Sequence, residues 1–517
     1  MRRTADSSAL DANMVSTRAV LGPRACRFTD QNHWTLFILA GASGALLCLT
    51  HGYAPWLAIP AVVPLLLVLT RSSLRQSFYL GLLCGFVETW ILWGVAYVGV
   101  GLFASLCLAY GLFRAAFAMT CVALRWNERR LCNALVPAAV WCVLEWLHGH
   151  VPYTLPNLLG DTQHEGPLLP LARLGGTHLV SFMIVWLAAA CVMVVIGWHR
   201  GGGIWRATSR LAPGVMSLLA LLVWAELEKP VPVAARTVVV VQGAITPTEY
   251  ATSETDILTR DRVREAYRSL TLAAPDADLT VWPETAVWEV FARGTDFDAF
   301  VRNVAAGRSG HLLAGLPRVD EHGDLRNSAV LFDRGREAAV DKRRIVVGVE
   351  AQFVPGDAVA ALPLDHETIG VLFCLESALP DYSLELMRHG ASLIVVLAEG
   401  GRFADTPVAR MHAQRSIVRA VETGRGVVHA GQGGWSTVVT SAGVAEPFLP
   451  PFFRGIMQAE VEIVDASTPF VRFGHWIVAI AVALLAVAVV DRLRLHPPSA
   501  GADGPPTRAA DTRAADL

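Results

Sequence analysis

Long apolar segments alternate with short polar ones over the first 226 residues of this 517-residue chain, and one more apolar segment lies near its C-terminus. Most are about as long as the ~20 residues that a helix needs to cross a bilayer. The pattern therefore predicts eight membrane-spanning helices, at about residues 34–50, 54–70, 77–98, 101–124, 132–148, 176–198, 211–226 and 474–490.

Between the seventh and eighth apolar segments lies a polar region, roughly residues 230–471, with a different pattern. Short apolar runs typical of buried strands alternate here with stretches that look helical, at 257–273 and 407–422. Such alternation indicates an α/β domain with a covered sheet. The expected strands include Val238–Val241, Leu279–Trp282, His311–Gly315, Ala329–Phe332, Thr368–Phe373 and Leu393–Leu397.

These patterns divide the chain into five expected segments. They are an N-terminal tail (1–32), a seven-helix transmembrane bundle (33–228), the α/β domain (229–471), an eighth transmembrane helix (472–491) and a tail (492–517). The last tail is rich in Pro, Ala, Gly and Asp, a composition that predicts disorder. The first 30 residues are polar and contain no A-x-A cleavage site, so we expect the first span to be a retained anchor.

Arginine placement predicts the orientation of the spans. Arginines precede the first span, recur in every second connection and follow the eighth span, whereas the connections between hold almost none. Under the positive-inside rule both termini are cytoplasmic and the 229–471 domain lies on the opposite side of the membrane. The arginines concerned are Arg2, Arg3, Arg18, Arg24, Arg27, Arg71, Arg75, Arg125, Arg129, Arg130, Arg200, Arg206, Arg210, Arg492 and Arg494.

Composition supports a membrane protein and argues against two classes of partner. Hydrophobic residues make up 53% of the chain and charged residues only 17%. The net charge of -2 gives no reason to expect nucleic acid as a partner. No CxxC pair or H-E-x-x-H motif occurs, so we expect neither a metal nor a redox cofactor.

Two charged residues fall inside predicted spans, Glu88 in the third and Arg114 in the fourth. Each lies roughly ten residues from the cytoplasmic end of its span, which places the two at similar depth. An unpaired charge at that depth costs at least ~2.5 kcal/mol, so we predict that they form an ion pair. The apolar connection at 151–172 could form a lipid-facing rim or a packed connection.

Lysine is almost absent, because only Lys229 and Lys342 occur among 43 basic residues. A lysine kept in such a chain is a candidate for a function that arginine cannot perform, since a compact ammonium can donate to a small oxyanion and its pKa can be tuned. Lys342 lies in the polar domain, after a strand and a turn. Glu284 and Cys374 each follow a predicted strand directly, where ligand-contacting residues of open α/β sheets collect.

A carboxylate, a lysine and a cysteine in one domain fit covalent acyl chemistry. Cys374 would attack an acyl carbon, and Glu284 would accept the thiol proton and later deprotonate the second substrate. Lys342 would remain protonated and hold the oxyanion, together with the backbone N–H of Leu375.

Other residues support or compete with these roles. Glu350 could orient the lysine or share protons, and Glu376 could do so from the side of the nucleophile. Three histidines of the domain, His389, His412 and His429, compete as bases. No serine stands in a G-x-S-x-G elbow, which argues against a serine hydrolase.

The polar domain contains a set of short motifs around these residues. They are Trp282-Pro283-Glu284, Asn327-Ser328, Lys342 with Glu350, Cys374-x-Glu376, Arg419-Ala420-x-Glu422-x-x-Arg425 and Gly434-x-Ser436. In combination they resemble the nitrilase superfamily of carbon–nitrogen hydrolases. With eight spans flanking one such domain, the chain resembles the bacterial apolipoprotein N-acyltransferases over about residues 30–490.

The resemblance implies an αββα sandwich for the polar domain and an N-acyltransferase in the bacterial inner membrane, with the catalytic domain on the periplasmic side. A thioester on the nucleophile would take an acyl chain from a phospholipid donor and pass it to the α-amine of a lipoprotein acceptor. The Glu-Lys-Cys roles of the family carry over to Glu284, Lys342 and Cys374, and Asn327 joins the supporting residues. No cofactor is implied.

The chain also departs from the family pattern near the expected site. Leu375 stands where the family usually has a tyrosine, and residues 398–404 and 429–434 differ from the usual stretches. The segment between Glu350 and Cys374 is short. Two alternatives therefore stay open: a membrane nitrilase acting on another amide or amine, similar to relatives encoded with conjugal-transfer systems, and a non-catalytic membrane scaffold.

Overall fold

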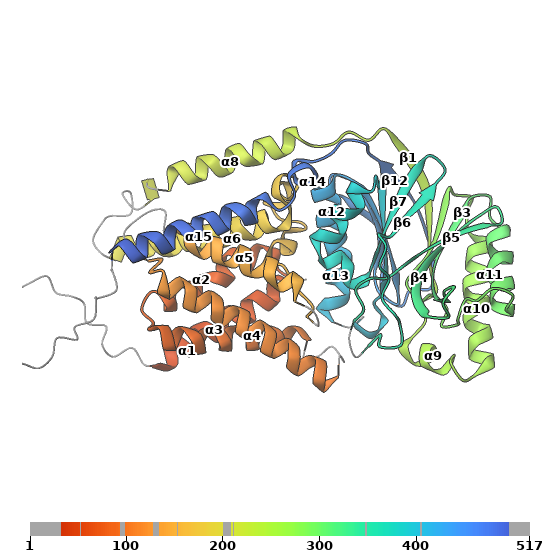
Figure 1. Cartoon of the computed structure of the whole chain (residues 1–517), viewed down its shortest axis with the longest axis horizontal. Coiled ribbons are helices and arrows are strands. Elements are labelled where there is room, and N and C mark those ends of the chain that lie inside the picture. The colour runs from red at the N-terminus through yellow and green to blue at the C-terminus, as the bar shows by residue number, and fades with distance from the viewer. Residues whose placement is uncertain are drawn as a thin grey trace, which may run out of the picture.

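The computed structural model describes residues 33–51, 53–93, 99–127, 134–151, 154–199, 208–209, 211–346, 349–403 and 406–495. A helical bundle forms one half of the molecule and an α/β domain the other (Figure 1). The predicted tail 1–32, and the predicted disorder from residue 496 onward, lie outside the described residues.

A helix stands at each of the eight predicted spans. Three described helices are long and apolar enough to cross a membrane by length and composition, namely Val100–Ala123, Leu169–His199 and Trp476–Arg494, and three others are shorter apolar helices. The eight-span topology therefore stays a prediction. The helices are α1 (His33–Thr50), α2 (Ala58–Leu69), α3 (Leu74–Trp93), α4 (Val100–Ala123), α5 (Leu135–His150), α6 (Ala172–His199), α8 (Ala212–Leu227) and α15 (Trp476–Leu495).

The predicted ion pair inside the bundle is confirmed. Arg114 on α4 donates from Nε and Nη2 to the two carboxylate oxygens of Glu88 on α3, each at 2.9 Å. The guanidinium also lies over the ring of Trp141 on α5, 4.0 Å from its centroid. This bidentate arrangement gives both buried charges a partner, as a low-dielectric interior requires.

The structure favours one of two open alternatives and moves one boundary. The connection, described from residue 154 to 172, is largely buried, which fits a packed connection rather than a lipid-facing rim. Helix α15 continues to Leu495, four residues beyond the predicted end at 491, so residues 492–495 are helical rather than disordered. Arg492 and Arg494 occupy its last turn, where positive charge favours the C-terminal end of a helix.

The α/β domain contains two six-stranded sheets. The first has the order β12-β1-β2-β3-β4-β5 and the second β11-β10-β9-β8-β7-β6. The first sheet comprises β1 (Ala234–Gln242), β2 (Leu279–Trp282), β3 (His311–Val319), β4 (Leu325–Asp333), β5 (Arg336–Asp341) and β12 (Gly455–Ile463). The second comprises β6 (Ala361–Leu364), β7 (Glu367–Phe373), β8 (Leu393–Glu399), β9 (Gly426–Gln432), β10 (Ser436–Val439) and β11 (Ala445–Leu449).

The central strands are buried on both faces, and successive residues face different cores, which makes this a four-layer αββα sandwich. One core lies between the sheets, where Val238 and Val281 of the first meet Val371 and Val395 of the second. Each sheet buries its opposite face under helices. These are α10 (Ile257–Ala273) and α11 (Asp296–Ala306) on the first sheet, and α12 (Pro380–Arg388) and α13 (Pro407–Thr423) on the second.

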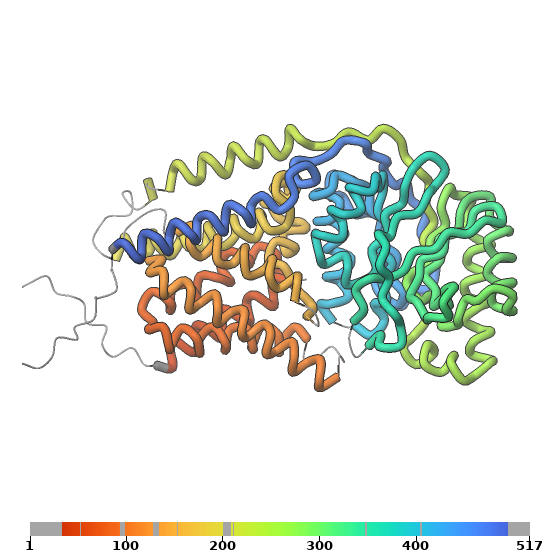
Figure 2. Tube along the Cα trace, viewed as in Figure 1, coloured from red at the N-terminus to blue at the C-terminus, as the bar shows by residue number. Residues whose placement is uncertain are grey.

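The domain joins the bundle through neighbouring strands. The chain enters from α8 into β1 and leaves from β12 through α14 (Pro469–Phe473) to α15, on the same side of the molecule (Figure 2). Strands β1 and β12 pair antiparallel along nine residues. Helices α12 and α13 lie between the second sheet and the bundle (Figure 1), and α13 contacts α6.

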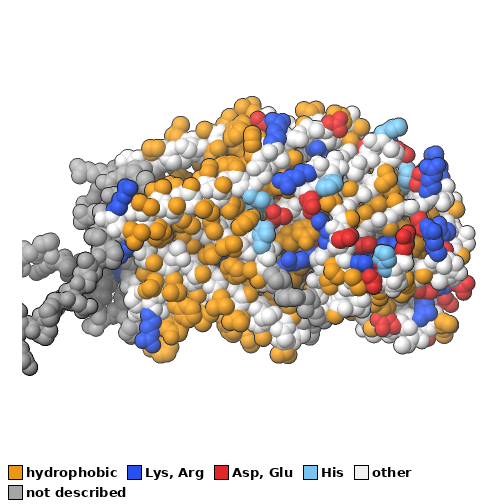
Figure 3. Space-filling model, in the orientation of Figure 1, with side chains coloured by type: hydrophobic (Ala, Val, Ile, Leu, Met, Phe, Trp, Pro, Cys, Tyr) orange, Lys and Arg blue, Asp and Glu red, His pale blue; other side chains and the backbone are white. Residues whose placement is uncertain are grey.

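The helical bundle and the α/β domain differ in the side chains that they expose. In the space-filling view apolar side chains gather over the bundle, whereas charged side chains are concentrated on the α/β half (Figure 3). Exposed apolar side chains on the bundle include Trp34, Trp56, Trp90 and Val100. A band of apolar surface is what a helical bundle presents to lipid.

Candidate functional site

The three candidate catalytic residues meet in one small cavity. Glu284 follows β2, Lys342 follows β5 and Cys374 follows β7, so strand ends of both sheets contribute. All three line a cavity of about 60 Å³, which we call the thiol cavity. Its wall also includes apolar side chains at the bundle end, among them Trp93, Leu102 and Leu155.

Lys342 is held between two carboxylates. Its Nζ lies 2.8 Å from Oε1 of Glu284 and 2.7 Å from Oε1 of Glu350, and the side chain is 1% exposed. Burial alone would lower the pKa of Lys342, but the attraction of Glu284 and Glu350 outweighs it and holds that pKa well above its ordinary value. The ammonium is therefore charged at neutral pH and fixed in position.

Glu284 accepts hydrogen bonds on both oxygens. Its Oε1 accepts from Lys342 Nζ and from Asn327 Nδ2, each at 2.8 Å, and its Oε2 accepts from the backbone N–H of Glu399 at 2.9 Å. Burial raises the pKa of Glu284, and the nearby Glu350 adds to the rise while Lys342 opposes it. A carboxylate with a raised pKa is suited to accept a proton.

The backbone requires glycine beside this carboxylate. A Cβ built on Gly315 of β3 would lie 2.2 Å from the carbonyl oxygen of Pro283 and 2.8 Å from Cα of Glu284. Only glycine permits so close an approach. Gly315 thus fixes where the Glu284 side chain starts.

Cys374 occupies a strained backbone position at the end of β7. Its φ is +42°, a left-handed conformation that non-glycine residues adopt rarely. Burial raises the pKa of the thiol, with Glu284 adding to the rise and Lys342 opposing it. The resting group is therefore a thiol, which needs a base at the moment of attack.

Glu376 and Glu350 bind the backbone of the loops that carry the reactive groups. Glu376 accepts from the N–H groups of Phe373, Arg343 and Arg344, at 3.0, 2.7 and 2.9 Å. Glu376 therefore links the strand before Cys374 to the residues after Lys342. Its hydrogen bonds go to these backbone amides rather than to the ammonium. Glu350 contacts the ammonium and also accepts from the N–H of Val346 at 2.8 Å.

Asn327 and Leu375 complete the predicted set. Besides Glu284, Asn327 donates to Oε1 of Glu350 at 3.3 Å. Its backbone carbonyl accepts from the N–H of Lys342 at 2.8 Å. The Leu375 side chain is buried in an apolar cluster with Trp93 and Leu155 of the bundle half. The role of the Leu375 N–H stays a prediction.

Only one of the three histidines lies beside the nucleophile. Nδ1 of His412, on α13, is 4.0 Å from Sγ of Cys374. Burial and the charge of Arg415 keep the pKa of His412 well below its ordinary value, so the ring is neutral. His389 is exposed, with Nδ1 against the carbonyl of Glu385, and His429 pairs with Ser416 at 2.8 Å.

Sequence reasoning missed Glu399, which ends β8 and lines the same cavity. Burial raises the pKa of its carboxyl to about 7, and Glu284 adds to the rise. The rule that selected Glu284 and Cys374, a polar residue at a strand end, would also have selected Glu399. Among the described residues, no group of three or more His, Cys, Asp or Glu could hold a metal ion.

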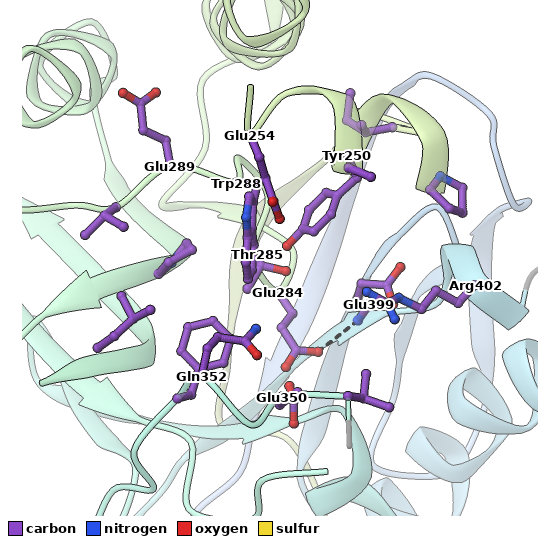
Figure 4. A pocket seen from close by; sticks show the side chains of 18 of the residues that line it. Tyr250, Glu254, Glu284, Thr285, Trp288, Glu289, Glu350, Gln352, Glu399 and Arg402 are labelled. Atoms are coloured by element: carbon purple, nitrogen blue, oxygen red, sulfur yellow. Dashed lines mark hydrogen bonds and ion pairs between the residues drawn. The ribbon is translucent and has the colours of Figure 1, made fainter. Parts of the chain in front are cut away.

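A second, larger cavity of about 1180 Å³ adjoins the thiol cavity and shares Glu284, Glu350 and Glu399 with it. Figure 4 shows Glu284 between Glu350 on one side and Trp288, Tyr250 and Glu254 on the other, with Glu399 beside it. We call the larger cavity the polar cavity. Glu284 therefore borders both cavities, whereas Cys374 lines the thiol cavity.

Helix α13 anchors the site to the bundle through buried charges. Arg419 lies 3.1 Å from Asp161 of the 154–172 connection and 2.9 Å from Glu422. Glu422 in turn accepts from Thr177 of α6 at 3.1 Å. Arg415, which also lines the thiol cavity, donates to Asn157 at 2.5 Å. The Arg-Ala-x-Glu motif on α13 thus joins the α/β domain to the helical bundle.

Comparisons with known proteins agree with this division. Residues 43–190 match the family model of the apolipoprotein N-acyltransferase N-terminal domain, and residues 237–467 match that of the carbon–nitrogen hydrolases. The chain is 26% identical to an apolipoprotein N-acyltransferase of Geobacter metallireducens, with 89% of this chain and 96% of the relative covered.

A second relative shows the same resemblance, and one solved structure is similar over part of the chain. An apolipoprotein N-acyltransferase of Azotobacter vinelandii is 28% identical, with 90% and 97% covered. The nitrilase-superfamily protein Nit3 of Saccharomyces cerevisiae is 16% identical with a TM-score of 0.38, and the match covers 45% of this chain and 91% of Nit3. With matches to both parts of the family and relatives aligned along nearly the whole chain, this protein belongs to the apolipoprotein N-acyltransferases, which carry a carbon–nitrogen hydrolase domain.

Proposed function

We propose that this membrane enzyme transfers a fatty acyl chain from a phospholipid to the N-terminal amine of a lipoprotein, through a thioester on Cys374. The observation that supports this most is the thiol cavity. It places a cysteine beside a lysine held between two carboxylates, and side chains of the apolar bundle form part of its wall. A lipid donor needs both the nucleophile and an apolar approach.

In the first half-reaction Glu284 accepts the proton of the Cys374 thiol while Sγ attacks the ester carbonyl of the phospholipid. The developing oxyanion receives hydrogen bonds from Nζ of Lys342 and the N–H of Leu375. Collapse of the tetrahedral intermediate breaks the ester C–O bond, and Glu284 returns the proton to the departing alkoxide. The products are a lysophospholipid and the Cys374 thioester.

In the second half-reaction the lipoprotein amine attacks the thioester carbonyl. Glu284 takes a proton from the attacking nitrogen, and Lys342 again holds the oxyanion. Expulsion of the sulfur forms the amide, and the proton on Glu284 returns to the thiolate. Glu350 and Asn327 hold these two groups in position in both half-reactions. Asn327 donates a hydrogen bond to Glu284, and Glu350 accepts one from Lys342 and one from Asn327.

We also propose that both termini are cytoplasmic and that the α/β domain is periplasmic, as the arginine pattern predicts. Donor and acceptor are both lipid-anchored, so the site must stand at the bilayer surface. The contact of α13 with α6 of the bundle is consistent with that position (Figure 1).

The test is an acylation assay with phospholipid vesicles and a synthetic S-diacylglyceryl-cysteinyl peptide. The proposal predicts that the peptide gains the mass of one acyl chain and that the Cys374→Ala variant produces none. Hydrolysis of a simple amide without acylation of the peptide would favour the amidase alternative. Failure of both reactions, with Cys374→Ala complementing cells as well as wild type, would favour a scaffold.

A further inference from the structure

The two cavities that meet at Glu284 differ in their walls. The thiol cavity is bounded by apolar residues of the bundle half, such as Leu102 and Leu155. The polar cavity is formed within the α/β domain, by residues of α9 (Pro247–Thr252), the loop after β2 and the 349–353 segment. Helix α9 lies at the lower edge of the domain, beside α10 (Figure 1).

The polar cavity is far larger than a single amine requires. At about 1180 Å³ it exceeds the ~300–1,000 Å³ typical of small-molecule sites. Its rim is solvent-accessible, since Pro247, Glu254 and Gln352 are exposed. A cavity with this size and rim can hold an extended chain of several residues that leads out into water.

One carboxylate at its rim is available to bind a positive charge. Five carboxylates and two arginines line the cavity, but Glu284 and Glu350 share the ammonium of Lys342, and Glu289 is paired with Arg264. Glu254, at the exposed rim, is in no ion pair within the described part of the chain. Tyr250, Trp288 and Phe353 add a row of rings, with centroids 5.0 and 5.7 Å apart. Aromatic faces and carboxylates together attract cationic side chains. The carboxylates are Glu254, Glu284, Glu289, Glu350 and Glu399.

We infer that the polar cavity binds the polypeptide segment that follows the acceptor amine, and that it favours basic residues in that segment. The inference rests on the proposed function. An amine placed at Glu284 would have its peptide in the polar cavity. Its lipid chains would extend past the apolar residues of the bundle that border the thiol cavity, because that cavity, at about 60 Å³, is too small to hold them.

The experiment compares diacylated cysteinyl peptides that carry either two lysines or two glutamates after the cysteine. Wild type should acylate the lysine peptide with the higher kcat/KM. The Glu254→Lys substitution at the rim should reduce that preference about fivefold, a factor that corresponds to one exposed charge interaction. Glu265→Lys is the matched control, because Glu265 on α10 is also exposed but lies outside the cavity, and it should keep the wild-type preference.

A second variant tests whether the peptide occupies the polar cavity, by filling part of that cavity with a larger side chain. Gln352→Trp should lower kcat/KM for a ten-residue acceptor and spare a diacylated cysteine amide that has no peptide. Thioester formation from phospholipid is measured in parallel for every variant. No thioester in wild type would refute the proposed function itself.

Two outcomes would overturn the inference alone. In the first, thioester formation is normal, but wild type shows no preference for the lysine peptide over the glutamate peptide, or Glu254→Lys leaves that preference unchanged. The other is slower thioester formation in both rim variants with acceptor constants unchanged, which would assign the polar cavity to the phospholipid headgroup.

Discussion

Two buried charge clusters, one at the thiol cavity and one where α13 meets the bundle, differ in the cation at their centre. One has Lys342 between Glu284 and Glu350, beside a cavity. The other has Arg419 between Asp161 and Glu422, with Ser383 and Thr177 also bound to Glu422. Lys342 is 1% exposed and Arg419 0%.

The difference follows from the geometry of the two cations. A guanidinium offers donors in a fixed plane and can join several fixed acceptors, as Arg419 does between the domain and the bundle. An ammonium is compact and can turn a donor toward an oxyanion that exists only briefly. Arg114, bidentate to Glu88, shows the same use of arginine for a static pair. A chain with two lysines places one where reaction chemistry is expected.

The largest effect should come from exchanging the cation of the reactive cluster. Lys342→Arg should lower kcat by about a thousandfold, as expected for loss of an oxyanion donor, because the broader guanidinium cannot occupy the same position. Purified variant protein is assayed for peptide acylation, with its melting temperature as control. Substantial activity in Lys342→Arg would refute the role of the ammonium.

The reverse exchange in the other cluster should affect stability instead of chemistry. Arg419→Lys keeps the charge but loses donors to Asp161, Thr177 and Ser377, leaving buried acceptors unpaired at a cost of about 1–3 kcal/mol each. Thermal unfolding in detergent should show a lower midpoint, while folded protein retains kcat. If Arg419→Lys abolished turnover at an unchanged melting temperature, the contrast between the clusters would be wrong.

Removing one support of the lysine should have a moderate effect. Glu350→Gln weakens a charged hydrogen bond worth about 1.5–3 kcal/mol, which corresponds to roughly a 10- to 100-fold lower kcat. Activity should fall without disappearing, because Glu284 still binds the ammonium at 2.8 Å. An activity as low as that of Cys374→Ala would instead place Glu350 among the groups that take part directly in the chemistry.

The smallest effect is a shift in pH dependence. The pKa of Glu284 is raised above its ordinary value of 4.5, mainly by burial and also by the charge of Glu350. The base acts as a carboxylate, so kcat/KM for the acceptor should fall as pH decreases through this raised pKa. Glu350→Gln removes a negative neighbour and should move the acid limb to lower pH. An unmoved limb would mean that another group limits the rate there.

The sequence predicted β2 and β7, which precede Glu284 and Cys374, and the two helices at 257–273 and 407–422, because apolar runs and strand-end positions are local features. Strand β5, which precedes Lys342, was missed because half of the residues in Arg336–Asp341 are charged and the strand is only partly buried. His412 and Arg415 could not be assigned, because which face of α13 meets Cys374 depends on packing against the bundle. The strand-end rule could have identified Glu399, but that residue was treated only as part of the 398–404 stretch that departs from the family pattern.

The most direct test of the account is intact-mass spectrometry of the full-length protein after incubation with phospholipid vesicles, beside the Cys374→Ala variant. The account predicts a fatty-acyl mass increment on wild type only, removed by hydroxylamine as a thioester would be. Folded wild-type protein whose Cys374 still reacts with an alkylating reagent, but which gains no acyl mass, would contradict it.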